Sequence, residues 1–362
     1  MSLKNHQLLI LFIIGLTACN PNDDSNESVK YDPTPYELNY PSYVPDPQIP
    51  QDNPLTKEGV KLGRMLFYET MLSSDESMSC ASCHLQSAGF SDPNTLSIGL
   101  QGLAGHRQAM GVFNMAWNDN GFFWDGRAEL LRHQSLLPIQ DPLEMDEDLD
   151  NVIAKLSISE VYRNQFVRAF GKEDITSHKI ALALEQFMNS IVSFDSKYDR
   201  FLAGLEELTE SEERGRQLFI TEYNPFFPEL SGADCNHCHG GFNFENDEYM
   251  NNGLDDASSM QDVGHISVTG NQSDWGKFKV TSLRNIALTA PYMHDGRFST
   301  LEEVIEHYNS GIQSSATLNP ALENPQSTGL MLSPEDIEDL IAFLNTLTDE
   351  QLALNSAYAN PF

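Results

Sequence analysis

The sequence predicts a mostly α-helical protein made of two related halves. The spacing Cys-x-x-Cys-His occurs twice, as "CASCH" at residues 80–84 and "CNHCH" at residues 235–239. A stretch with helical amphipathic spacing and an internal glycine precedes each copy, "KEGVKLGRMLFYE" and "SEERGRQLFITE". An Asp-Gly-Arg triplet follows each copy, in "FFWDGRAELL" and "YMHDGRFSTL". Features that recur in the same order indicate an internal duplication.

The first residues have the pattern of an export signal. Lys4 precedes an apolar run from Leu8 to Leu16, and small residues lead to Cys19. This run is shorter than the ~20 residues of a transmembrane helix. We expect residues 1–18 to be a lipoprotein signal peptide and Cys19 to carry lipid, so that the exported protein is held on the periplasmic side of a membrane or at the cell surface. Ordinary secretion with removal of Cys19 is the alternative.

Three parts follow the predicted signal peptide. Residues 19–54 are rich in Pro, Asn, Asp and Ser without an apolar period, which predicts a disordered tether. The two halves are then expected at residues 55–198 and 199–362. Helical spacing at residues 148–156, 178–194 and 334–347 supports a helical fold. The last of these begins with Ser333 as N-cap and Pro334 in the first turn.

The cysteines point to covalent haem. If Cys19 carries lipid, the remaining four belong to the two motifs and none is left for a structural disulfide. Disulfide exchange would not need the histidine, and no βαβ pattern surrounds either motif. A zinc site would need four ligands in one cluster, whereas the motifs are far apart in the sequence. In c-type haem attachment the two thiols bind the haem and the next histidine ligates the iron. We therefore predict two haem c groups in two cytochrome c-like domains.

The attachment residues follow from this spacing. They are Cys80, Cys83 and His84 for the first haem, and Cys235, Cys238 and His239 for the second.

The formal net charge of −32 argues against nucleic acid as a partner. It would attract a basic protein, such as a small electron carrier, or it serves only to keep the protein soluble.

With these motifs and their flanks, the chain resembles the bacterial di-haem cytochrome c peroxidase and MauG family over about residues 50–350. The resemblance is carried by "PLTKEGVKLGRMLFYETMLS", "CASCH", "FFWDGRAELL", "DPLEM", "CNHCH" and "SLRNIALTAPYMHDGRFSTLEEV". It implies that one haem meets hydrogen peroxide and that the other stores or relays electrons. The electrons come from a small donor protein in the peroxidases, and from an oxidisable partner protein in MauG-like enzymes.

The resemblance assigns the peroxide-reactive haem to His84. Many family peroxidases carry a capping histidine in a Ser-Ile-Gly-His context, but this chain has Leu100 in "LSIGLQG", which cannot coordinate iron. We therefore expect an open iron, unless a shifted loop brings His106 to it; an ordinary loop histidine is the alternative. Glu144 matches the family's distal acid, although a Glu in an acidic run is usually exposed. Trp124 matches the tryptophan between the haems, a role compatible with core packing.

The second haem differs from the peroxidase pattern. Where those enzymes supply an axial methionine beside the His239-bound iron, this chain has Tyr308 in "EHYN". Tyrosinate is a hard anionic donor that stabilises oxidised iron, and this is the MauG-like pattern. His307 and Met293 are the rival ligands, and simple packing of Tyr308 is a further alternative.

The resemblance also implies one calcium ion between the domains. Thr289 and Pro291 match positions that bind through backbone carbonyls, while Gln108 stands where the family has an asparagine.

The motifs and the resemblance together suggest three alternative functions. The first is reduction of peroxide with electrons from a small redox protein. The second is MauG-like oxidation of a partner's side chains, and the third is electron transfer without catalysis.

Overall fold

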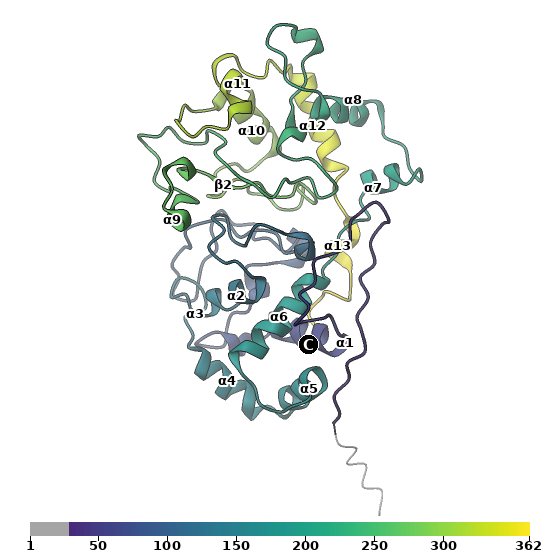
Figure 1. The fold of residues 1–362 in the computed structure, drawn as a ribbon, viewed down its shortest axis with the longest axis vertical. Coiled ribbons are helices and arrows are strands. Elements are labelled where there is room, and N and C mark those ends of the chain that lie inside the picture. The colour runs from purple at the N-terminus through teal and green to yellow at the C-terminus, as the bar shows by residue number, and fades with distance from the viewer. Residues whose placement is uncertain (1–28) are drawn as a thin grey trace, which may run out of the picture.

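Two pairs of crossing helices form the framework of the protein, which the computed structural model describes over residues 29–362 (Figure 1). Helix α1 (Lys57–Phe67) crosses α6 (Ser177–Ser190), and α8 (Glu210–Ile220) crosses α12 (Pro334–Asn345). A Cβ on Gly63 would lie 1.9 Å from the Ala183 carbonyl oxygen, and a Cβ on Gly215 would lie 1.9 Å from that of Asp339. Only glycine permits this approach. The repeated crossing confirms the predicted duplicated helical fold.

Shorter elements complete each half around loops. The remaining helices of the first half are α2 (Leu131–Gln134), α3 (Leu137–Gln140), α4 (Leu149–Ile158) and α5 (Glu160–Phe170). Those that follow are α7 (Lys197–Leu202), α9 (Ile266–Thr269), α10 (Leu301–Glu306), α11 (Glu323–Thr328) and α13 (Glu350–Leu354). Strands β1 (Tyr249–Met250) and β2 (Phe278–Lys279) pair antiparallel. Helix α12 begins as predicted, with the Ser333 hydroxyl accepting from the Asp336 N–H at 3.2 Å.

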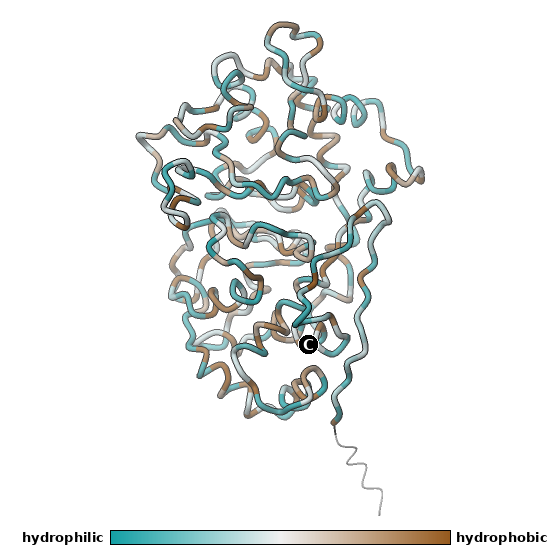
Figure 2. Tube along the Cα trace, in the orientation of Figure 1, coloured by the Kyte–Doolittle hydropathy of each residue, from teal (hydrophilic) through white to brown (hydrophobic). Residues whose placement is uncertain are grey.

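Each half has its own apolar core. Leu62, Leu66 and Phe187 are fully buried in the first, and Phe219 and Phe343 in the second. Each such side chain contributes about 1.5–3 kcal/mol on burial. Hydrophobic and hydrophilic residues are interspersed along the chain (Figure 2), and no helix within residues 29–362 is long and apolar enough to cross a bilayer.

The segment before α1 packs on the protein. Residues 29–54, here called the N-terminal strap, run along one side of both halves (Figure 1). The Tyr43 hydroxyl donates to Asp199 at 2.5 Å, and the Trp117 indole N–H donates to the Pro45 carbonyl at 2.7 Å. Val44 is buried. The predicted disordered tether is therefore wrong for these residues, because such contacts offset the entropy cost of ordering. The predicted signal peptide and lipidated Cys19 lie outside the described residues.

The chain ends on the first half. Leu352 in α13 and Tyr358 belong to the first core. The Arg64 guanidinium donates to the Ala359 carbonyl at 2.6 Å, and the Tyr68 hydroxyl donates to that of Tyr358 at 2.8 Å. The prediction that the second half extends to residue 362 is therefore wrong for residues 349–362, which cross back to fill the first core.

Candidate functional site

Both cysteine motifs line one cavity between the halves. Its volume is about 1090 Å³, and His84 and His239 lie on its wall with Cys83 and Cys238. Most ligand pockets hold about 300–1,000 Å³. The lining is mainly apolar, including Phe113, Met188, Phe219, Leu340 and Leu344. The cavity therefore suits a large, flat, apolar cofactor on each side.

The two motif histidines are oriented in the same way. His84 Nδ1 donates to the Phe90 carbonyl at 2.8 Å, and His239 Nδ1 donates to the Phe244 carbonyl at 3.2 Å. Both phenylalanines have left-handed backbones, with φ of 58° and 54°. Fixing Nδ1 leaves Nε2 free to bind a metal, as in most histidine ligands. Burial lowers the pKa of both histidines, which favours the neutral form that coordinates iron.

The motif thiols are unpaired. Cys80, Cys83, Cys235 and Cys238 are free rather than joined in disulfides. Cys80 and Cys235 are half-buried and pack against the two apolar cores, and desolvation raises the pKa of each thiol to about 12. Two thiols and one oriented histidine on each side of an apolar cavity fit a covalently attached haem. Among the described residues, no cluster of His, Cys, Asp or Glu is arranged to hold a bare metal ion.

Glu144 lies on the cavity wall beside the first motif. Cys83 and His84 of that motif line the same cavity. Within the described part of the chain the Glu144 carboxylate has no hydrogen-bond partner. Burial, helped by the charge of Asp141, raises the pKa of Glu144 to about 7, while nearby Arg127 opposes this. A carboxyl group with this pKa can both donate and accept a proton near neutral pH.

The loop with Leu100 packs against the Glu144 loop. The Leu100 N–H donates to the Glu144 carbonyl at 2.8 Å. A Cβ on Gly99 would lie 1.9 Å from the Leu143 carbonyl oxygen, so the two loops touch closely. Leu100 is absent from the cavity wall, whereas His106 lies on it with an exposed side chain. His106 therefore remains the alternative ligand for the iron of the first haem, as the sequence suggested.

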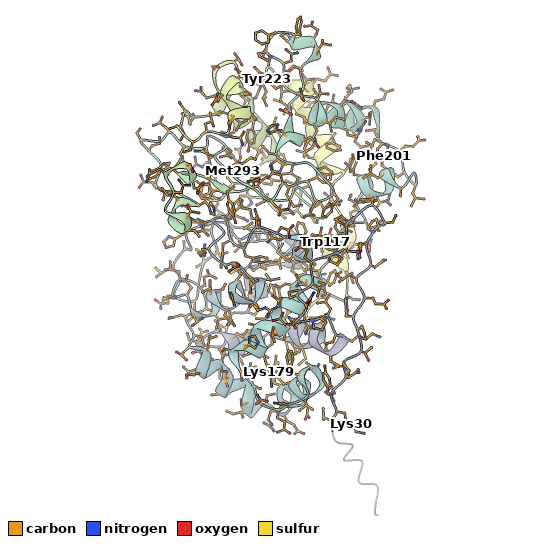
Figure 3. The ribbon with its side chains drawn as sticks, in the orientation of Figure 1. Lys30, Trp117, Lys179, Phe201, Tyr223 and Met293 are labelled. Carbon is orange, nitrogen blue, oxygen red and sulfur yellow. The ribbon has the colours of Figure 1, made fainter. Side chains whose placement is uncertain are left out.

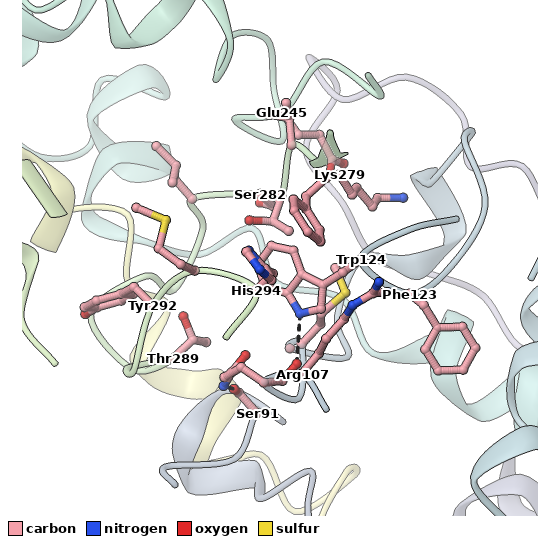
Figure 4. A pocket seen from close by; sticks show the side chains of 18 of the residues that line it. Ser91, Arg107, Phe123, Trp124, Glu245, Lys279, Ser282, Thr289, Tyr292 and His294 are labelled. Carbon is pink, nitrogen blue, oxygen red and sulfur yellow. Dashed lines mark hydrogen bonds between the residues drawn. The ribbon is translucent and has the colours of Figure 1, made fainter. Parts of the chain in front are cut away.

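Trp124 lines the cavity and lies beside His294 (Figure 4). Its indole N–H donates to the Gln108 carbonyl at 2.8 Å. The His294 ring meets it edge to face, with 6.5 Å between ring centroids, and stacks on Phe278 at 3.7 Å. Trp124 and His294 occupy matching places before the two Asp-Gly-Arg triplets. The duplication thus brings both residues together at the junction of the halves.

Sequence reasoning missed the polar groups that join the halves. Arg107 pairs with Asp125 of its own half and with Asp262 of the other, both at 2.7 Å. Lys279, whose pKa burial lowers to about 8, donates to the Gly121 carbonyl at 2.7 Å and to the side chains of Asn118 and Asn120. Only Asp125 had a sequence signal, as the first residue of an Asp-Gly-Arg triplet.

Tyr308 lies in a π-helical turn, His307–Gly311, that continues α10. Such turns occur often at functional sites. Tyr308 and Met293 both line the cavity, and the Asn252 side-chain amide donates to both, at 3.3 Å to the hydroxyl and 3.4 Å to the sulfur. Burial raises the pKa of Tyr308 to about 12, helped by the charges of the second motif's cysteines. His307 instead donates to the Asn252 carbonyl at 3.1 Å. The structure favours Tyr308 or Met293 over His307, and ligation by Tyr308 stays a prediction.

The three predicted calcium ligands reach the same cavity. Gln108, Thr289 and Pro291 all line it, and the Gln108 N–H donates to the His294 carbonyl at 2.9 Å. The Gln108 side-chain amide donates to Ser91, and the Thr289 hydroxyl donates to the Ile286 carbonyl. All three residues line the cavity, and their binding of calcium stays a prediction.

Comparison with known proteins identifies the family. Residues 57–207 match the family model "Di-haem cytochrome c peroxidase". The chain is 32% identical to the methylamine utilization protein MauG of Methylophilus methylotrophus, covering 98% of each chain. It is 34% identical to the cytochrome c551 peroxidase of Nitrosomonas europaea over 82% of each chain.

Solved structures agree with the sequence relatives. A MauG-like protein associated with microbial copper homeostasis matches with a TM-score of 0.82 and 34% identity, covering 90% of this chain and 99% of that one. The diheme peroxidase BthA of Burkholderia thailandensis shares the fold, with a TM-score of 0.72 at 20% identity over 85% of this chain and 90% of that one. The chain therefore belongs to the di-haem cytochrome c peroxidase and MauG family.

Proposed function

We propose that this protein reduces hydrogen peroxide with electrons from a small redox protein. Membership of the family implies two haems and an enzyme acting on peroxide. The observation that carries the proposal is the Glu144 carboxyl group. It is unpaired among the described residues, lies beside the first attachment motif and has a pKa near 7. A protein that only transferred electrons would not need a proton shuttle there.

The residues of the first site have distinct roles in this proposal. A haem held by Cys80, Cys83 and His84 would supply the iron that binds peroxide and accepts its oxidising equivalents. Glu144 takes the proton from the bound end of peroxide and returns it to the departing oxygen. The side chain of Glu144 is half-buried on the cavity wall, where its carboxyl group could reach a bound peroxide. Trp124, which lines the cavity that both motifs share, would pass electrons from the second site.

Tyr308 favours a second candidate, MauG-like oxidation of side chains on a partner protein. It lies in the cavity near the second motif, where an anionic oxygen ligand would stabilise oxidised iron. This activity would use the same peroxide-reactive site but would draw electrons from a partner's side chains. The two candidates therefore differ in the source of the electrons.

The first experiment is low-temperature EPR of the ferric protein before and after one equivalent of hydrogen peroxide. One high-spin and one low-spin signal, both lost on addition, would support either enzymatic function. Two low-spin signals that ignore peroxide would mean that both irons are capped, and would leave electron transfer without catalysis. Steady peroxide turnover with a reduced cytochrome c then separates the peroxidase from an enzyme that instead leaves oxidised residues on a partner.

We also propose that the protein is an exported lipoprotein anchored through Cys19. The support is the sequence pattern before Cys19 alone. Mass spectrometry of the N-terminal peptide tests this, because a lipid-modified Cys19 as first residue is expected. An unmodified N-terminus after Cys19 would contradict it.

A further inference from the structure

Few Lys or Arg side chains of the second half are free of an ion pair. Residues 217–276 and 298–362 contain no lysine or arginine, although both stretches contain many Asp and Glu residues. Among the described residues from 199 onward, six of the seven Lys and Arg side chains form ion pairs. The seventh, Lys279, is buried between the halves. The Asp and Glu residues of this half outnumber these cations, so it carries a net negative charge.

An apolar tip projects from this acidic half. Residues 222–234, here called the tip loop, expose Phe226 by 84%, Phe227 by 55% and Leu230 by 65%. The Asn224 side-chain oxygen accepts from the N–H groups of Phe226 and Phe227 at 3.0 and 3.1 Å. These bonds fix the backbone that carries both phenyl rings. The loop forms the upper end of the molecule (Figures 1 and 2). Exposed apolar clusters of this kind mark sites of interaction.

The tip loop is joined directly to the second haem motif. Ala233 and Asp234 at its end line the cavity, and Cys235 follows. Asn236 and His237 within the motif are exposed. A partner on the tip loop would thus bind the chain segment that leads directly into the second haem motif.

The chain that follows the first motif is instead held by the C-terminal segment. The Gln86 side-chain amide, just after that motif, donates to the Leu352 and Asn355 carbonyls at 2.9 Å each. The C-terminal segment therefore lies beside the first motif, in which Ser82 stays exposed. The tip loop also lies at the opposite end of the molecule from Lys30, where the N-terminal strap begins (Figure 3). A protein held by its N-terminus would leave the tip loop free.

We propose that the tip loop is the docking site for a small basic redox protein whose contact face is apolar and ringed by lysines. This inference rests on the proposed peroxidase function. The acidic half attracts the donor over a distance, and the two phenylalanines supply the desolvated centre of the contact. Hydrogen peroxide, two electrons and two protons give two waters. Two reduced donor molecules, each losing one electron, are therefore oxidised per peroxide.

The test compares two paired variants of the haem-loaded full chain. Phe226→Ser/Phe227→Ser changes the tip loop. Ile158→Ser/Val161→Ser, with exposures of 82% and 62%, removes equally exposed apolar groups from the first half. The probe is a reduced, lysine-rich mitochondrial-type cytochrome c at saturating peroxide. Each kcat/KM for the probe is divided by the rate of the same variant with a small organic reductant.

We expect this ratio to fall about tenfold or more in the tip-loop variant, because residues at the centre of a protein contact contribute most of the binding energy. The ratio should stay at the wild-type value in the Ile158→Ser/Val161→Ser control. The wild-type kcat/KM should also fall steeply as salt rises. A tip-loop ratio within twofold of wild type would overturn the docking site while leaving the peroxidase function intact. Equal rates with basic and acidic cytochromes c would overturn the proposal that the partner is basic. Failure to consume peroxide with either reductant would overturn the proposed function itself.

Discussion

Replacing Glu144 with glutamine should remove the proton shuttle and keep the shape of the cavity. A general acid–base group contributes about 10²–10⁴-fold to the rate, so peroxide consumption should fall by that factor. The pKa of about 7 also sets a pH dependence. The ionised fraction falls from about 90% at pH 8 to about 10% at pH 6, which predicts an approximately tenfold fall in wild-type kcat/KM for peroxide. A glutamate with an ordinary pKa would stay ionised over this range.

The assay is stopped-flow peroxide reduction with a small reductant, followed from pH 5 to pH 9 at constant haem content. Asp146→Asn is the matched control, because it removes a charge from the same loop at a residue that does not line the cavity. The control should keep the inflection near pH 7. Persistence of that inflection in Glu144→Gln, or a rate within threefold of wild type, would refute the assigned role.

Three further predictions concern stability and the second site. Because the pKa of Glu144 rises from 4.5 to about 7 on folding, ionisation of this group destabilises the folded state as the pH rises through this window. Glu144→Gln should therefore raise the free energy of unfolding, measured by denaturant titration, by up to about 3 kcal/mol at pH 8 and hardly at pH 4. An equal effect at both pH values would contradict this. Tyr308→Phe should change one low-spin EPR signal while His307→Gln leaves it; the reverse would make His307 the ligand. Arg284→Met should cost about 3–5 kcal/mol in thermal unfolding by stranding buried Asp199, and a loss below ~1 kcal/mol would argue against this pair.

The sequence predicted what local patterns determine. The haem-attachment motifs, the crossing helices and the Ser333 cap each depend on neighbouring residues. The N-terminal strap was missed because its stability depends on surfaces that both halves build, such as the one that buries Val44. Residues 349–362 were placed in the wrong half for the same reason, since nothing in their own sequence indicates the core that Tyr358 joins.

The site was predictable in its residue types and less so in its electrostatics. The resemblance pointed to Glu144, but its raised pKa depends on burial that only the packed loops show. Arg107 and Lys279 were missed because each is a single basic residue in a loop without a pattern. Their partners come from the opposite half, so only the assembled structure reveals them.

The two haem motifs share a local geometry but differ in their surroundings, and this difference favours one direction of electron flow. The first motif has the Glu144 carboxyl group on the cavity side and the C-terminal segment packed against the chain that follows it, which suits the proposed reaction with peroxide there. The second has Tyr308 inside and an exposed motif with an apolar tip loop outside. Trp124 and His294 meet between them. The two copies of the duplicated fold thus differ in what packs on each. In the proposed function, electrons would enter at the second motif, pass Trp124 and be consumed at the first.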